Sequence, residues 1–164
     1  EQYGAGVFTK TIAYKSVGIT SLQQFLQSRG RVFSDVFLDW MTAVYVNNAA
    51  VGPAFSYQRP ELQRLWVVPS VTAQLVRGGE VSSPLSVKPW QPIWASFLVD
   101  THEVSRDVRV SIEGQTPGSF PAREVVAYRD GLIDTVSIPT NTGTTFVRSR
   151  GICISSITIL ATYV

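Results

Sequence analysis

The chain is poor in the residues that most often carry chemistry. Its 164 residues include a single cysteine, Cys153, and a single histidine, His102. One cysteine excludes an internal disulfide, and the apolar neighbours Ile152 and Ile154 predict a buried, unreactive thiol. A zinc-binding helix of the common peptidase type needs two imidazoles one turn apart, which one histidine cannot provide. We therefore expect neither a complete catalytic site nor a metal site within this chain.

Charge and long apolar runs are also scarce. Charged residues make up 16% of the chain, and 14 basic against 12 acidic residues leave a net charge of +2. Without a run of Lys or Arg the chain lacks the footprint of phosphate binding, so we expect no nucleic-acid partner. No run approaches the roughly 18 apolar residues of a membrane-spanning helix, so we expect no membrane span.

The beginning of the chain and its apolar content suggest that a further segment or another chain packs against it. The chain opens at Glu1 without a basic and apolar signal segment, so we expect a processed chain or a fragment of a longer protein. Hydrophobic residues make up 45% of the sequence, which is typical of a packed globular protein. The low charge predicts that some apolar surface meets an upstream segment, another chain or a second copy.

Helical patterns occupy the first third of the chain. Residues 3–16 are weakly helical, and a second helix is predicted to start with a capping box in which Thr20 and Gln23 satisfy backbone amides. Gly30 lies where such a helix needs a left-handed residue. The clearest helix covers residues 34–46, with Ser34 as its N-cap. Its expected apolar stripe consists of Val36, Phe37, Trp40, Met41, Val44 and Tyr45.

Prolines then mark residues 51–70 as an ordered linker, with one short strand at residues 65–68. From residue 71 onward, apolar residues alternate with polar ones, which is typical of half-buried strands. Asp130–Gly131 predicts a β-hairpin turn, and the β-branched tail at residues 152–164 predicts a central strand. Further expected features are strands at residues 71–76, 93–99, 108–113 and 124–128 and a turn at residues 141–143.

These patterns predict a mainly β protein in which two or three N-terminal helices precede an antiparallel β-sandwich of jelly-roll type. We expect a helical segment over residues 1–50, a linker over 51–70 and a β-sandwich domain over 71–164.

Four aromatic residues form the main candidate binding feature. Tyr57, Trp66, Trp90 and Trp94 could provide a platform for stacking of a sugar or polymer. The interpretation that we favour is that they pack between the helical segment and the sandwich, because aromatic residues beside prolines at a junction usually do so.

Acidic residues provide two weaker candidates. Asp100, Glu103 and Asp107 place oxygen ligands in one loop, which would suit calcium, although their spacing matches no standard calcium loop. Asp35 and Asp39 lie one helical turn apart, where a paired-carboxylate role is conceivable. For Asp35 we favour a role at the positive end of the helix dipole, and for Asp39 a solvated surface position.

The helical region resembles part of a known enzyme family. Residues 18–26, 30–31 and 33–48, followed by an aromatic segment at residues 55–57, are similar to the end of the catalytic domain in secreted bacterial zinc metallopeptidases of the immune-inhibitor-A and hyicolysin-type group. The shared pattern is a Gly-Ile start, a short helix, and then Phe-x-x-x-Phe-x-x-Trp-x-x-Ala-x-Tyr with a polar stop. The resemblance covers roughly residues 15–65.

The resemblance implies a C-terminal, non-catalytic part of such a protein. The family's two-histidine zinc helix lies upstream of this region and is absent from the chain, so zinc is expected only in a missing upstream catalytic domain. By the same resemblance, Phe37 and Trp40 would serve packing alone, and the protein would be extracellular or at the cell surface. Whether the chain is enzymatic stays open. Two alternatives also remain: a self-assembling jelly-roll subunit of a shell or filament, and a carbohydrate-binding β-sandwich.

Overall fold

The computed structural model describes residues 17–76, 78–99, 108–113, 120–138 and 153–163, and the backbone of residues 142–147. The chain forms two compact units, residues 1–37 and residues 38–164. The boundary falls inside helix α3 (Phe33–Val46), so the second half of this helix belongs to the same unit as all the strands. The sequence had suggested a helical segment extending to residue 50.

The first unit contains helix α2 (Ile19–Gln27) and the first turn of α3. The predicted capping box is wrong, because Thr20 lies inside α2 and the helix starts after Gly18 without a side-chain cap. The Gln23 side chain instead accepts a hydrogen bond from the Phe33 amide at 2.8 Å. Gly30 has a φ of 68°, which confirms the left-handed residue expected after the helix.

The second unit starts with the remainder of α3. The predicted N-cap at Ser34 is wrong, because the helix already begins at Phe33. A single 3-10 turn, η1 (Pro53–Phe55), follows, and residues 65–68 are irregular rather than a strand. The strands are β1 (Val71–Leu75), β2 (Ile93–Val99), β3 (Val108–Glu113), β4 (Ala122–Tyr128), β5 (Ile133–Ile138), β6 (Thr142–Val147) and β7 (Ile154–Ala161).

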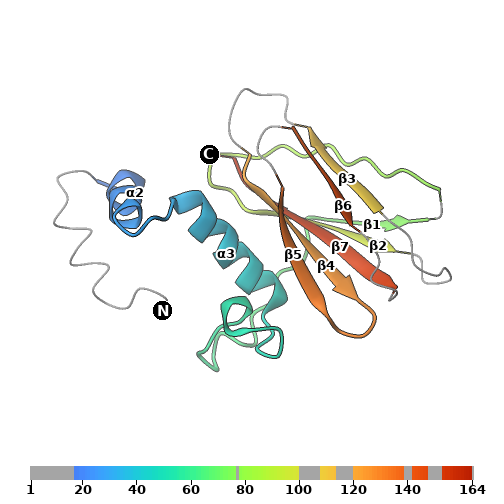
Figure 1. The fold of residues 1–164 in the computed structure, drawn as a ribbon, viewed down its shortest axis with the longest axis horizontal. Coiled ribbons are helices and arrows are strands. Elements are labelled where there is room, and N and C mark those ends of the chain that lie inside the picture. Colours follow the sequence, from blue (N-terminus) through green and yellow to red (C-terminus); the bar gives the residue numbers. More distant parts are fainter. Residues whose placement is uncertain are drawn as a thin grey trace. The chain divides into compact units, whose positions relative to one another are not determined.

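The described strands form one five-stranded sheet in the order β1-β2-β7-β4-β5 and one two-stranded sheet of β3 and β6 (Figure 1). The prediction that the tail supplies a central strand is confirmed, since β7 lies in the middle of the larger sheet. The expectation of a wholly antiparallel sheet is wrong for one pair, because β1 and β2 run parallel. The fold is therefore mainly β with a mixed sheet and N-terminal helices.

One face of the larger sheet carries the apolar core. Val126, Ile138, Ile157 and Ile159 are buried on this face, and the half-buried apolar side chains of β3 pack against them. The same side of β4 carries the fully buried side chain of Glu124. The opposite face presents Trp94 and Ser96 of β2, Thr158 and Leu160 of β7, and Arg123 and Val125 of β4, which lie directly opposite one another in the strand register.

The predicted hairpin between β4 and β5 is confirmed. Gly131 has a φ of 87°, and the Asp130 carboxylate accepts a hydrogen bond from the Leu132 amide at 3.0 Å. An aspartate that binds the backbone two residues on, followed by a glycine with positive φ, is typical turn chemistry. The predicted turn at residues 141–143 is replaced by a strand at two of its positions, because β6 begins at Thr142.

Candidate functional site

The structure places the four candidate aromatic residues in different environments. Trp94 is buried, and its indole nitrogen donates a hydrogen bond to the backbone carbonyl of Met41 in α3 at 3.3 Å. The Tyr57 hydroxyl accepts a hydrogen bond from the Trp40 indole at 3.1 Å. Trp90 is half-buried in a turn with a φ of 58°. Trp66 alone among the four is largely exposed, at 84%. The four side chains therefore do not share one exposed platform.

The second half of α3 is attached to the sheet by a chain of hydroxyl groups. The Tyr45 hydroxyl lies 2.7 Å from the Thr158 hydroxyl of β7, and the Thr158 hydroxyl lies 3.1 Å from the Ser96 hydroxyl of β2. Thr158 and Ser96 are both buried. Since a buried hydroxyl without a partner is costly, this chain satisfies polar groups that would otherwise penalise the contact between helix and sheet.

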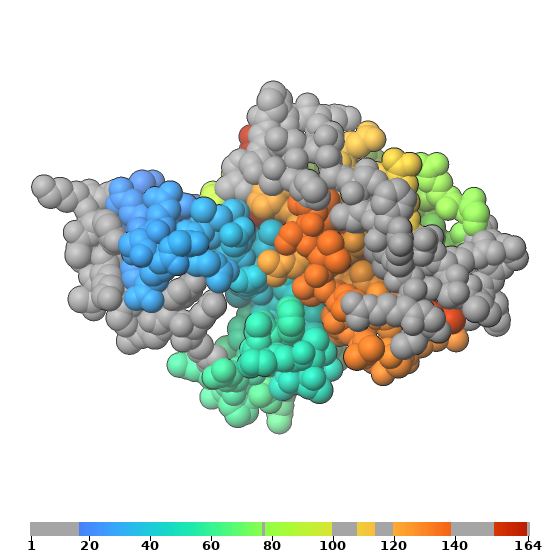
Figure 2. Space-filling view, viewed as in Figure 1, coloured from blue at the N-terminus to red at the C-terminus, as the bar shows by residue number. Residues whose placement is uncertain are grey.

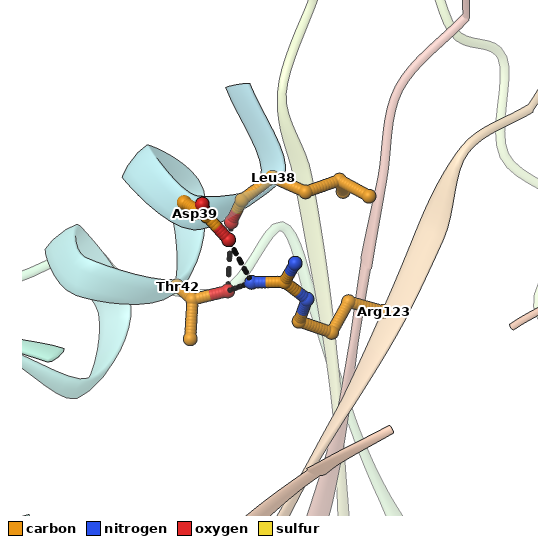
Figure 3. A network of polar contacts seen from close by, with 4 residues as sticks. All are labelled: Leu38, Asp39, Thr42 and Arg123. Atoms are coloured by element: carbon orange, nitrogen blue, oxygen red, sulfur yellow. Dashed lines mark hydrogen bonds and ion pairs between the residues drawn. The ribbon is translucent and has the colours of Figure 1, made fainter. Parts of the chain in front are cut away.

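A charged group reinforces the same contact from β4. The Arg123 guanidinium reaches α3 and lies 2.8 Å from a carboxylate oxygen of Asp39 and 3.1 Å from the Thr42 hydroxyl (Figure 3). Thr42 is fully buried and donates in turn to the Leu38 carbonyl at 2.7 Å. Asp39 is thus a partner of Arg123 and not the solvated carboxylate that the sequence suggested.

The apolar stripe of α3 also differs from the prediction. The buried side chains of the helix are Leu38, Met41, Thr42 and Val44, whereas Trp40 is 41% exposed. The buried face of the helix therefore includes Leu38 and Thr42, and the buried Thr42 hydroxyl is satisfied within the helix by the Leu38 carbonyl. Trp40 lies at the edge of this contact and is bound by Tyr57.

Asn47 organises the loop that follows α3. Its amide nitrogen donates to the carbonyls of Leu62, Gln63 and Leu65 at 3.1, 3.1 and 2.6 Å, and its amide oxygen accepts from the Tyr57 amide at 3.2 Å. Asn47 itself has a φ of 36°, a conformation that asparagine tolerates better than most residues. The loop, visible in teal at the surface in Figure 2, is therefore held by one side chain at the end of the helix.

The loop leads into an exposed apolar segment, residues 65–76, which runs from the loop through β1. Leu65, Trp66, Val68 and Val76 in this segment are exposed. Exposed apolar side chains that lie close together in the sequence are typical of an interaction site. The exposed apolar segment is the best candidate for such a site in the described part of the second unit.

Sequence reasoning missed the residues that build the contact between α3 and the sheet. Arg123, Thr158 and Asn47 each looked ordinary, because a charged or hydroxyl residue in an alternating strand, or an asparagine at a helix end, has many uses. One signal was available for Arg123: the helix that carries Asp39 has no Lys or Arg of its own to pair with this carboxylate.

The metal candidates lie mostly outside the described residues. The calcium hypothesis at Asp100, Glu103 and Asp107, and also His102, fall within residues 100–107, which the structure does not describe. Among the residues that it does describe, no group of three or more His, Cys, Asp or Glu side chains could hold an ion. Cys153, expected to be buried, is half-buried.

Within the described ranges, no helix is sufficiently long and apolar to cross a membrane. No family model, curated protein or solved structure matches the chain.

The ion pair of Arg123 can be tested by a double-mutant cycle. We expect Arg123→Met and Asp39→Asn to be coupled by about 1 kcal/mol in the free energy of unfolding, since the pair is partly shielded from solvent. Urea denaturation of the single and double variants measures the coupling. Asp35→Asn, on the preceding turn of the same helix, is the matched control and should show no coupling to Arg123→Met; equal coupling for both carboxylates would contradict the contact.

Two buried threonines near the end of the chain provide a second test. Thr158→Val should lower the free energy of unfolding by about 1–2 kcal/mol, because Tyr45 and Ser96 each lose a hydrogen-bond partner. Thr162 is equally buried, but among the described residues its hydroxyl has no hydrogen-bond partner. Thr162→Val should therefore be neutral or stabilising by up to about 1 kcal/mol. Thermal and urea denaturation compare the two, and a similar loss in both variants would be the contrary result.

The role of Asn47 can be separated into side chain and backbone. Asn47→Gly keeps the positive φ accessible and removes only the amide, and we expect it to cost about 1–3 kcal/mol of stability. Asn48→Gly is the neighbouring control, because the Asn48 side chain makes one exposed local bond, to the Ala50 amide. Proteolysis within residues 57–65 should increase for the Asn47 variant alone. Equal stability and equal cleavage of both variants would contradict a role in holding the loop.

Proposed function

We propose that the chain is the non-catalytic C-terminal part of a secreted, metallopeptidase-like protein, in which a helical tail and a β domain support or position an upstream catalytic part. The sequence resemblance over roughly residues 15–65 motivates this proposal. In it, zinc belongs to the missing upstream domain, and the protein works outside the cell or at its surface.

One structural observation supports the proposal more than any other. The resembling segment includes α3, and the second half of α3 is built into the β unit through Arg123, Thr158 and Trp94. A tail of a catalytic domain that is merely followed by an independent domain would not need such contacts. Their presence suits a β unit whose task is to hold the end of the preceding domain.

The finer description of the β unit is part of the same proposal. We infer a β-sandwich of jelly-roll type, in which the sheet of β3 and β6 covers the core face of the larger sheet. The packing of the β3 side chains Val108, Val110 and Ile112 against that core supports this arrangement. Their burial alternates with exposed Arg109, Ser111 and Glu113, as expected for a strand with one covered face.

The test begins with the gene. The open reading frame before Glu1 should encode a His-Glu-x-x-His motif, the longer protein should hold zinc and cleave casein, and the isolated chain should do neither. Removing the residues after Asn48 from the longer protein should lower its melting temperature, because the second half of α3 loses its cover. Metal analysis, casein cleavage and thermal denaturation are the readouts.

Several results would overturn the proposal. One is an upstream region without a zinc motif. Another is stoichiometric zinc with casein cleavage in the isolated chain. A third is a truncated longer protein with unchanged melting temperature. Arg123→Met in the longer protein is a milder version of the truncation and should lower the melting temperature without changing the zinc content.

A further inference from the structure

Strand β1 is an edge strand of the larger sheet, since it ends the strand order of the described residues. In the described part of the chain it pairs with β2 alone, and its five residues, Val71–Leu75, include neither a charge nor a proline. Sheet edges in soluble proteins are usually blunted by charged side chains, prolines, bulges or a covering segment, since unpaired backbone groups attract another strand. β1 has no charged side chain, no proline and no bulge.

The exposed apolar segment includes this edge strand and the residues on either side of it. Residues 65–76, between Arg64 and Arg77, contain no charged residue. Trp66 and Val68, just before β1, are 84% and 79% exposed, and Val76, just after it, is also exposed. An uncharged edge strand flanked by exposed apolar side chains is suited to association with a further strand.

We propose that β1 is a self-association edge, which pairs antiparallel with β1 of a second copy about a twofold axis at Ala73. In this register Val71 lies opposite Leu75 of the other copy, and Thr72 lies opposite its Gln74. The two larger sheets then become one continuous sheet, through a closed twofold interface. This inference is independent of the proposed function.

A second copy fits this edge because the strand is its own complement. Val71, Ala73 and Leu75 are half-buried and lie on the core face, whereas Thr72 and Gln74 are exposed on the opposite face. Antiparallel pairing about the middle residue therefore matches apolar with apolar and polar with polar side chains on both faces. It also covers the incompletely buried rim of the core with apolar side chains of the other copy.

The first experiment compares like charges with opposite charges placed across the twofold axis. Thr72→Lys with Gln74→Lys places like charges opposite one another twice, whereas Thr72→Lys with Gln74→Glu places opposite charges there twice. We expect the first variant to raise the dimer dissociation constant about tenfold, or ~1.4 kcal/mol, and the second to leave it equal or lower. Sedimentation over a concentration series gives the constants, and circular dichroism shows whether both variants fold.

The second experiment tests the register by disulfide cross-linking in a Cys153→Ser background. Ala73→Cys should cross-link two copies under oxidation, because this position faces itself across the axis at a distance that a disulfide can bridge. Val71→Cys alone should not cross-link, since it faces Leu75. Val71→Cys combined with Leu75→Cys should cross-link again. Non-reducing gel electrophoresis reads the result.

The outcomes decide the proposal in either direction. A wild-type chain that stays monomeric throughout the concentration series overturns it. So does a dimer that responds equally to the two charge variants, because it would use another surface. Growth into open, concentration-dependent polymers also overturns the closed twofold pairing. A dimer weakened by the like-charge variant alone, with cross-linking at Ala73→Cys but not at Val71→Cys, supports it.

Discussion

The contact between α3 and the larger sheet is the constraint on which the second unit depends. It combines a buried indole, a chain of hydroxyl groups and the guanidinium of Arg123 between helix and strand. A purely apolar seam would hold the helix at many rotations, since hydrophobic contact is not directional. The hydrogen bonds select one rotation, because only that orientation pairs Thr42 and Tyr45 with their partners in the sheet.

That choice of rotation has consequences beyond the helix. It leaves Trp40 at the edge of the seam, where Tyr57 of the following loop binds it, and it fixes the end of the helix from which Asn47 reaches the loop carbonyls. The loop then leads directly to the exposed residues before β1. The packing of α3 against the sheet thus sets where the loop begins, and the loop leads in turn to the exposed apolar segment.

The sequence predicted what depends on local patterns and missed what depends on pairing across the fold. The β4–β5 hairpin, the left-handed Gly30 and the central position of the tail strand followed from turn chemistry, backbone freedom and β-branched residues. The parallel pairing of β1 with β2 and the partnership of Arg123 with Asp39 join residues far apart in the chain, and no local signal encodes them. The exposure of Trp66 was equally hidden, because a tryptophan beside prolines is typical of both a packed junction and a binding surface.

The central place of β7 sets an order for biosynthesis. β7 hydrogen-bonds to β2 on one side and β4 on the other, and it is the last of the described strands to leave the ribosome. Until then β1 with β2, and β4 with β5, are separate two-stranded pieces, which are rarely stable alone. The apolar strands on either side of β7 therefore stay unassembled until β7 has been synthesised, and they are prone to aggregation in that interval.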